Sequence, residues 1–332
     1  MAKGKKWVLV KHFDGLPKRT DLEIKEFDLP KLKDGDVLLE TVVLTVDPYM
    51  RGWSNRMKEG DTMMGEVFGR VVESKDPKTK VGDLGLVRAG WVTHAVVPGS
   101  SILKVPALPK GVPQSLALGT LGMPGLTAYF GILEVCEIKP SDTVYVNAAA
   151  GAVGSVVGQI AKLKGCRVIG AAGTEEKVKY LKSELGFDEA YNYKTVTPDK
   201  LKDELKKIAP DGIDVFFENV GGEASSVIYS HMNKDGRVAI CGAISNYNSP
   251  GNSKPKVTEF VHHLIYNSIR IQGFLVTNFY AKRDPALKEM AGWVKEGKLK
   301  YREHVHKGFE SMYDAFMALF TGKNTGKVVI NI

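Results

Sequence analysis

Short apolar runs broken by glycine and proline dominate the first third of the chain, up to about residue 120. Apolar and polar positions alternate in several of these runs, and the others are rich in valine and leucine, which is typical of β-strands. We therefore expect a β-rich first part. The predicted strands are Trp7–Val10, Val37–Val46, Glu66–Glu73, Leu84–Val87, Thr93–Val97 and Ile102–Val105.

From Leu116 onward, strand-like and helix-like patterns alternate, which predicts an α/β fold with a doubly wound parallel sheet. A last strand-like run, Lys327–Ile332, is expected to return to the β-rich part, giving domains 1–120 with 300–332 and 121–299. The predicted strands of the sheet are Thr143–Asn147, Cys166–Ala171, Val215–Glu218, Arg237–Cys241 and Ile269–Val276. The predicted helices are Ser155–Lys164, Glu175–Leu185, Pro198–Ile208, Glu223–Met232 and Pro285–Glu296.

A glycine-rich turn lies between the first strand of this sheet and the helix after it. Its sequence, Ala149-x-Gly151-x-x-Gly154, has alanine at the first position of the usual glycine pattern but stands in a strand-turn-helix context. In that context, backbone N–H groups at the positive end of the helix bind the pyrophosphate of a dinucleotide. The turn predicts a Rossmann-type cofactor site; the alternative is a glycine turn that allows tight strand-helix packing.

The tip of the second strand indicates which dinucleotide binds. NAD-specific folds place an acidic residue there for the ribose 2′-OH, but this strand ends in Gly170-Ala-Ala-Gly-Thr174. Glu175 and Glu176 follow, and Lys177 supplies a cation that suits a 2′-phosphate. We expect NADPH rather than NADH, unless Lys177 is an ordinary surface lysine.

Composition and charge exclude several classes of protein. The 332 residues are 43% apolar and 25% charged, without an apolar run long enough to cross a membrane or a signal-like start, so we expect a cytoplasmic protein. The net charge of +8 comes from lysines interspersed with acidic residues, which indicates solvated helix faces and no nucleic-acid partner.

Longer motifs carry a resemblance over nearly the whole chain, from His12 to Lys327. The chain resembles the prostaglandin reductases, a zinc-free branch of the medium-chain dehydrogenase/reductase superfamily. The motifs are Leu44-Thr-Val-Asp-Pro-Tyr-Met-Arg51, Gly122-Met-Pro-Gly-Leu-Thr-Ala-Tyr-Phe-Gly131, Val146-Asn-Ala-Ala-Ala-Gly-Ala-Val-Gly-Ser155, Glu218-Asn-Val-Gly-Gly222 and Ile240-Cys-Gly-Ala-Ile-Ser245. The resemblance implies a GroES-like β-rich catalytic domain, a Rossmann domain that binds NADPH, and a homodimer.

The resemblance also implies the cofactor contacts. They comprise the phosphate turn, two residues at the 2′-phosphate, the end of the fourth strand, two segments beside the nicotinamide, and one residue near the C-terminus. In this sequence they are Gly151, Ala152, Val153, Gly154, Ser155, Lys177, Tyr193, Asn219, Cys241, Gly242, Ala243, Ile244, Ser245, Asn246, Tyr247, Phe274, Leu275, Val276 and Asn324.

We expect no metal. Zinc-dependent members of the superfamily take cysteine and histidine ligands from the first domain. Here no cysteine precedes Cys136, and Met64-Gly65-Glu66 stands where the Gly-His-Glu ligand motif would be. Without zinc, reduction of an activated C=C bond is the simpler chemistry, since it needs hydride delivery to the β-carbon and donors for the enolate oxygen.

The implied reaction is NADPH-dependent reduction of α,β-unsaturated ketones and aldehydes, such as 15-oxo-prostaglandins and lipid-derived alkenals. Tyr266, on a predicted helix, is the expected donor to the enolate, with the cofactor ribose hydroxyl as a rival and a core-edge tyrosine as the alternative. Tyr49 and Arg56 are expected to border the substrate, as a ring wall and as a cation for a lipid carboxylate. Arg51 and Arg56 are equally compatible with surface positions.

Two other functions stay open from the sequence. One is an NADP-dependent alcohol dehydrogenase of hydroxy-lipids such as leukotriene B4, and the other is a non-catalytic or RNA-binding relative of the quinone reductases. We expect the turn-rich loop Asn246–Lys256 to influence substrate range. The strand Ile269–Val276, at the sheet edge, is expected to pair across the two-fold axis of a dimer.

Overall fold

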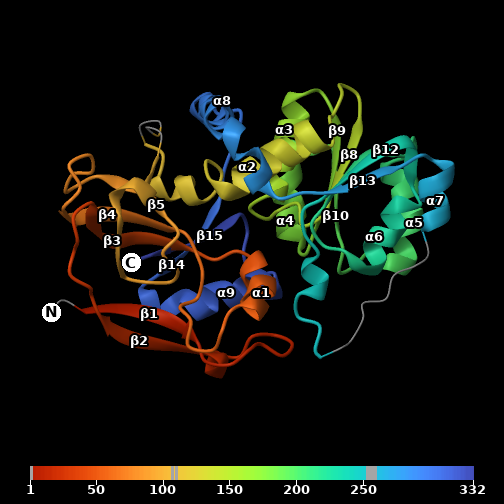
Figure 1. Ribbon diagram of the computed structural model, residues 1–332. Coiled ribbons are helices and arrows are strands. Elements are labelled where there is room, and N and C mark those ends of the chain that lie inside the picture. The colour runs from red at the N-terminus through yellow and green to blue at the C-terminus, as the bar shows by residue number, and fades with distance from the viewer. Residues whose placement is uncertain (1–2, 106–107, 109–110, 252–259) are drawn as a thin grey trace. The chain divides into compact units, whose positions relative to one another are not determined.

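The computed structural model describes residues 3–105, 108, 111–251 and 260–332 (Figure 1). The chain divides into two compact units, one formed by Met1–Gly119 with Glu303–Ile332 and the other by Thr120–Arg302. Within the described ranges, no helix has the length and apolar character that crossing a bilayer requires.

The larger unit is built on a six-stranded sheet in which all neighbouring strands run parallel, in the order β10-β9-β8-β11-β12-β13. This order confirms the predicted doubly wound sheet. The strands are β8 (Thr143–Val146), β9 (Arg167–Ala172), β10 (Glu189–Asn192), β11 (Ile213–Glu218), β12 (Met232–Ile240) and β13 (Arg270–Gly273). The helices of this unit are α2 (Met123–Phe130), α3 (Gly154–Leu163), α4 (Glu175–Ser183), α5 (Pro198–Ile208), α6 (Gly222–Tyr229), α7 (Val261–Tyr266) and α8 (Arg283–Lys295).

Several predicted boundaries are wrong in this unit, among them the start of β12, which lies at Met232 and not at Arg237. The edge strand expected to reach Val276 ends at Gly273, because its partner β12 ends at Ile240, which pairs with Gly273. The helix expected to reach Met232 ends at Tyr229, and Met232 already pairs with Ile213 at the start of β12. The predicted loop Asn246–Lys256 is described only up to residue 251, and residues 252–256 lie outside the described part.

The smaller unit is β-rich, as predicted. Its main sheet has the order β14-β15-β3-β4-β5-β7, with β6 also paired to β3, and β1 and β2 form a separate two-stranded sheet. The strands are β1 (Lys3–Leu9), β2 (Leu22–Asp28), β3 (Asp36–Thr45), β4 (Val67–Ser74), β5 (Leu84–Val87), β6 (His94–Pro98), β7 (Leu103–Lys104), β14 (Glu303–Lys307) and β15 (Lys327–Asn331). Its helices are α1 (Tyr49–Trp53) and α9 (Met312–Thr321).

The C-terminal segment forms part of the core of this unit. The Trp7 indole donates a hydrogen bond to the backbone oxygen of Phe309 over 2.9 Å, and the Trp91 ring meets Phe316 of α9 edge-on at 5.5 Å. All four rings are buried. The sequence analysis missed α9, although Met312, Phe316 and Leu319 recur at helical spacing and Gly322 ends the helix in a left-handed conformation, with φ of 66°.

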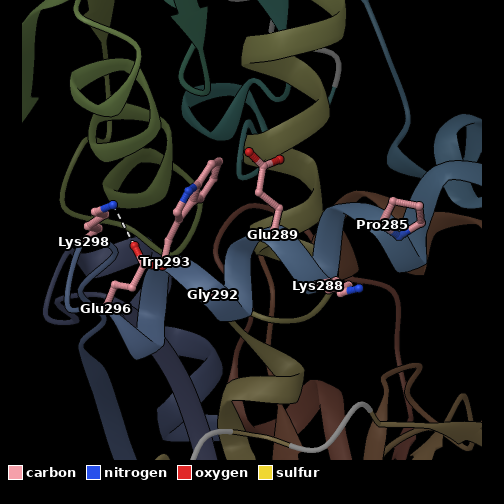
Figure 2. A pocket seen from close by; sticks show the side chains of 7 residues that line it. All are labelled: Pro285, Lys288, Glu289, Gly292, Trp293, Glu296 and Lys298. Carbon is pink, nitrogen blue, oxygen red and sulfur yellow. Dashed lines mark ion pairs between the residues drawn. The ribbon is translucent and has the colours of Figure 1, made fainter.

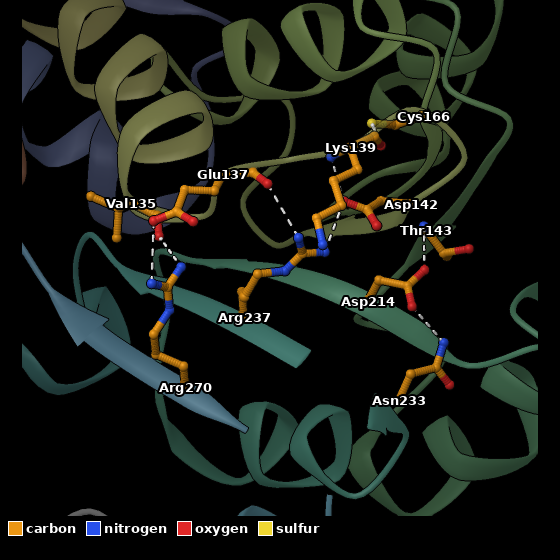
Figure 3. Close-up of polar contacts among 10 residues, drawn as sticks. All are labelled: Val135, Glu137, Lys139, Asp142, Thr143, Cys166, Asp214, Asn233, Arg237 and Arg270. Atoms are coloured by element: carbon orange, nitrogen blue, oxygen red, sulfur yellow. Dashed lines mark hydrogen bonds and ion pairs between the residues drawn. The ribbon is translucent and has the colours of Figure 1, made fainter. Parts of the chain in front are cut away.

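A network of charged side chains lies toward the amino ends of the parallel strands, at the edge of the sheet opposite their carboxyl ends (Figure 3). The Arg237 guanidinium donates to the Asp142 carboxylate over 2.8 Å, and the two side chains are each 12% exposed. A second arginine, Arg270, pairs with Glu137 over 3.2 Å, but these side chains are 46% and 61% exposed. The two arginines therefore offer a buried and an exposed ion pair side by side.

We expect Arg237→Met to lower the free energy of unfolding by about 3 kcal/mol, because Asp142 is left as a poorly solvated charge. The matched variant Arg270→Met should cost less than about 1 kcal/mol, since water screens its pair. Urea unfolding followed by circular dichroism measures both. Equal losses in the two variants would contradict this assignment.

Candidate functional site

The carboxyl ends of the six parallel strands lie along one edge of the sheet, which is where doubly wound folds bind ligands. The predicted cofactor residues of the larger unit all follow these ends. Residues 151–155 follow β8, Lys177 lies in α4 after β9, Tyr193 follows β10, Asn219 follows β11, residues 241–247 follow β12 and residues 274–276 follow β13. The sheet thus brings together residues that are up to 125 positions apart, from 151 to 276.

The turn after β8 fits a phosphate group. A Cβ atom at Gly154 would lie 2.6 Å from the Ala148 carbonyl oxygen and 2.8 Å from the Ala149 Cα, so no other residue lets the backbone close this turn. Helix α3 begins at Gly154, and its positive end therefore faces the turn. The Ala149 amide donates to the Ala171 carbonyl of β9 over 3.0 Å, which fixes the turn to the sheet.

The tip of β9 explains the missing acidic residue. A Cβ atom at Gly173 would lie 2.8 Å from the Tyr193 hydroxyl, so the tyrosine occupies the space that a side chain at this position would need. Glu175, two residues on, accepts a hydrogen bond from the Asn192 side chain over 2.9 Å. The acidic residues after the tip are therefore not arranged as in an NAD-specific site.

Two lysines interact electrostatically at this edge of the sheet: Lys177 in α4, and Lys194, which follows Tyr193. Burial, together with the neighbouring positive charge of Lys194, lowers the pKa of Lys177. Thr174 caps α4 by accepting from the Lys177 amide over 3.2 Å, which fixes the lysine in the first turn of the helix. Like charges brought together at a half-buried position are favoured by an anion between them, and a 2′-phosphate fits that requirement. The sequence analysis missed Lys194, because the short strand β10 before it was not predicted.

The segment after β12 offers a largely neutral wall. Burial raises the pKa of the Cys241 thiol to about 12, with a further contribution from Glu218, so the thiol is uncharged at neutral pH. The Tyr247 hydroxyl accepts from the Ala243 amide over 3.3 Å and folds the segment back on itself. After β13, the Phe274 ring packs edge-on against Phe217 at 6.2 Å, whereas Leu275 is 67% exposed.

A buried polar cluster that the sequence analysis did not single out lies at the centre of this edge. Glu218 ends β11 and is 2% exposed, and Asn147 follows β8 and is 7% exposed. The Asn147 side chain donates to the Glu218 carboxylate over 2.6 Å. Both residues occur in the motifs noted above, but their contact depends on the pairing of β11 with β8, which the sequence alone does not give.

The predicted substrate residues lie in the smaller unit, together with Asn324. Tyr49 begins α1 and is 41% exposed, and Arg56 is exposed with its guanidinium 4.7 Å from the Trp53 ring centroid. A surface position is wrong for Arg51, which is 3% exposed and donates to the backbone oxygens of Phe13 and Gly15. Arg51 thus has a structural role.

A buried ion pair fixes the start of α1. The Lys327 ammonium group lies 2.6 Å from the Asp47 carboxylate and donates to the Val46 carbonyl over 2.9 Å. The side chains of Lys327 and Asp47 are 4% and 8% exposed. Tyr49 follows Asp47 closely in the sequence, and Asn324 closely precedes Lys327. The ion pair therefore anchors the chain near both residues.

Glu66, at the place of the zinc-ligand motif, faces this pair. Burial raises the pKa of its carboxyl group, against the opposing charge of Arg88, whose Nε lies 3.6 Å from it.

Tyr266 is the last residue of α7 and its side chain is 80% exposed. That exposure excludes the alternative of a core-edge tyrosine. The phenol is therefore available to a ligand, which is the first requirement for the expected enolate donor.

A shallow pocket of about 530 Å³ lies along α8, and Figure 2 shows Glu289 and Trp293 projecting from that helix. Its lining includes none of the predicted site residues. The Glu289 carboxylate is engaged by the Tyr129 hydroxyl at 2.6 Å. The lining residues are Pro285, Lys288, Glu289, Gly292, Trp293, Glu296 and Lys298. We therefore assign the candidate site to the sheet edge.

Comparison with known proteins agrees with this geometry. Residues 5–105 match the family model described as the N-terminal domain of oxidoreductase, and residues 152–294 match the one described as zinc-binding dehydrogenase. Prostaglandin reductase 1 of Oryctolagus cuniculus is 55% identical over 98% of this chain and 93% of its own length. The NADP(+)-dependent 2-alkenal reductase of Nicotiana tabacum is 41% identical over 99% of this chain and 97% of its own length.

A solved structure shares the whole architecture. CurA from Vibrio vulnificus, crystallised in complex with NADPH, superposes with a TM-score of 0.90 at 38% identity and covers 98% of each chain.

We expect Lys177→Ala to weaken NADPH binding by about tenfold or more, through loss of a charge-assisted hydrogen bond, and to leave NADH binding unchanged. The control is Lys179→Ala, which removes an exposed lysine of the same helix and should change the affinity for neither cofactor.

In the wild-type protein, the preference for NADPH should fall as pH rises through the pKa of Lys177, because the lysine then loses its charge. This pKa is lowered, so the fall should begin at a pH below the ordinary lysine value of 10.5. Fluorescence titration with both cofactors measures this. Equal losses for NADH and NADPH would contradict the role of Lys177.

Proposed function

The chain belongs to the prostaglandin reductase branch of the medium-chain dehydrogenases/reductases, and we propose that it is an NADPH-dependent reductase of α,β-unsaturated ketones and aldehydes. The observation that carries the choice of NADPH is the electrostatic interaction of Lys177 with Lys194, the residue after Tyr193, whose hydroxyl lies against the glycine tip of β9. NADPH is the cofactor of this reaction. When bound, it supplies the hydride.

The protein's share is to bind and orient. The turn at residues 151–155 holds the pyrophosphate, and Lys177, Tyr193 and Lys194 hold the 2′-phosphate. Asn219, residues 241–247 and residues 274–276 would line the nicotinamide, and Asn324 is a further proposed cofactor contact. The Cys241 thiol is uncharged, which makes it a poor nucleophile toward an electrophilic substrate.

Tyr266 would donate a hydrogen bond to the enolate oxygen that forms when NADPH supplies a hydride to the β-carbon. A proton from solvent would then complete the reduction at the α-carbon. The phenol O–H of Tyr266 would stabilise the negative charge that develops on the enolate oxygen. Tyr49 forms a ring wall for the substrate, and Arg56, stacked on Trp53, provides a cation for a carboxylate at the end of a lipid chain. We propose 15-oxo-prostaglandins and lipid-derived alkenals as substrates, and the smaller unit as the catalytic domain.

We further propose a homodimer paired along β13. This edge strand has half-exposed or exposed side chains throughout, and Ile265 and Leu275 near its two ends are 68% and 67% exposed. A single-protomer mass in sedimentation velocity would contradict the dimer. The cytoplasmic location stays a prediction, and fractionation of the source cells tests it.

The function is tested with a turnover panel of enones, enals, quinones and alcohols, each with NADPH or NADP⁺ and with NADH or NAD⁺. We expect enones and enals to be reduced with NADPH, with turnover on quinones and alcohols lower. Faster oxidation of hydroxy-lipids than reduction of enones would instead indicate an alcohol dehydrogenase. Binding of NADPH without oxidation by any acceptor would indicate a non-catalytic protein.

We expect Tyr266→Phe to lower kcat for enone reduction by about 10²–10³, the usual effect of removing one donor to a developing oxyanion. The KM for NADPH should not change, because the phenol contacts the substrate. Tyr301→Phe, a half-exposed tyrosine of the same unit outside the site, serves as control. Wild-type turnover in Tyr266→Phe would remove this residue from the mechanism and leave the ribose hydroxyl as the donor.

A further inference from the structure

One carboxylate oxygen collects three hydrogen bonds at the centre of the cofactor edge. The Oε1 of Glu218 accepts from the Asn147 side chain at 2.6 Å, the Val220 amide at 2.6 Å and the Gly221 amide at 2.9 Å. The other oxygen, Oε2, is buried and has no hydrogen-bond partner among the described residues. Burying a carboxylate with one oxygen unpaired costs free energy. We therefore ask which segments this side chain holds in place.

The first two segments that it joins are the turns after β8 and β11. The Asn147 side-chain oxygen accepts from the Asn219 amide over 2.7 Å, and the Asn147 carbonyl accepts from the Asn219 side chain over 3.0 Å. Asn147 starts the stretch that becomes the phosphate turn, and Asn219 is itself an expected cofactor contact. Glu218 therefore sets the distance between these two turns through Asn147.

The third segment is the one after β12. The Glu218 carbonyl accepts from the Cys241 amide over 2.8 Å, and the Asn219 carbonyl accepts from the Ile244 amide over 3.2 Å. The Ser245 hydroxyl donates to the Val220 carbonyl over 2.6 Å. The turn that the Glu218 carboxylate closes at Val220 and Gly221 is thus the support for residues 241–245.

We propose that Glu218 is a positioning residue for NADPH, acting through Asn147 and Asn219 to hold three cofactor-binding segments in one arrangement. This inference rests on the proposed function in so far as these segments bind the nicotinamide cofactor. The acceptor geometry of Oε1 is what matters, because all three donors converge on that atom. A glutamine can present the same oxygen, whereas a methionine of similar size cannot.

The same strand supplies a matched control. Asp214, near the other end of β11, accepts from the Thr143 amide over 2.8 Å and from the Asn233 side chain over 2.8 Å (Figure 3). Like Glu218, it joins a backbone amide and an asparagine side chain through one carboxylate. It differs in that no expected cofactor contact lies in the segments it joins.

The experiment measures the affinity of the full-length protein for NADP⁺ by isothermal titration calorimetry, with thermal unfolding in parallel. We expect Glu218→Met to weaken NADP⁺ binding at least about tenfold and Glu218→Gln to stay within about threefold of wild type. Asp214→Leu and Asp214→Asn should lower the unfolding temperature and leave the affinity unchanged. A residue with a purely structural role would not separate affinity from stability in this way.

Two results would overturn the inference: wild-type affinity in Glu218→Met, or an equal loss of affinity in Asp214→Leu. If Glu218→Met does not fold, Asn147→Ala replaces it, because this change removes the side-chain bonds to both Glu218 and Asn219. Unchanged NADP⁺ affinity in Asn147→Ala would also overturn the inference. A wild-type protein that does not bind NADP⁺ at all would instead overturn the proposed function. Calorimetry therefore distinguishes the two failures without any turnover measurement.

Discussion

Parallel pairing of six strands is the constraint on which the rest of the larger unit depends. Because every strand runs the same way, each chain segment that leaves the sheet toward the ligand does so at the same edge. The chain goes from β8 outward through β9 to β10 and then returns to β11 on the other side of β8. The turns after β8 and β11 therefore lead in opposite directions. The backbone hydrogen bonds between the strands do not fix the spacing of these turns, so side-chain contacts have to do so. The Asn147–Glu218 contact stands at that place.

In the proposed NADPH site, the space at the tip of β9 bears on cofactor selectivity together with the charge of nearby lysines. Gly173 ends the strand tip where an acidic residue would bind a ribose 2′-OH, and the Tyr193 hydroxyl fills the volume that its side chain would take. The strand β10 delivers both Tyr193 and Lys194 to this point, and α4 delivers Lys177. In the proposed site, the Tyr193 hydroxyl takes the place of an acidic side chain, and Lys177 and Lys194 supply the positive charge that suits a phosphate.

The sequence predicted five of the six strands of the sheet and the phosphate turn, but not the contacts that the turns make. Strands β8 and β9 are largely apolar and were predicted nearly to the residue, whereas β10, Glu189–Asn192, is short and half polar and was missed. Because β10 was not predicted, the proximity of Lys194 to Lys177 was not predicted either. Glu218 was placed in a strand, but its role depends on the register that sets Phe217 opposite Val146. Registers and side-chain contacts between distant segments are long-range properties, and local periodicity carries no information on them.

A contact between residues distant in the sequence also shapes the smaller unit, here through a buried ion pair. Lys327 and Asp47 lie 280 positions apart, and each is nearly inaccessible to water. Desolvating both charges is costly, so the pair contributes little net stability unless its geometry is close and further bonds complete it; the additional bond from Lys327 to the Val46 carbonyl provides one. What the pair does provide is a defined direction for the chain at Pro48, because Asp47 is held just before α1 begins. The position of Tyr49 therefore depends on β15, the last strand of the chain, in which Lys327 lies.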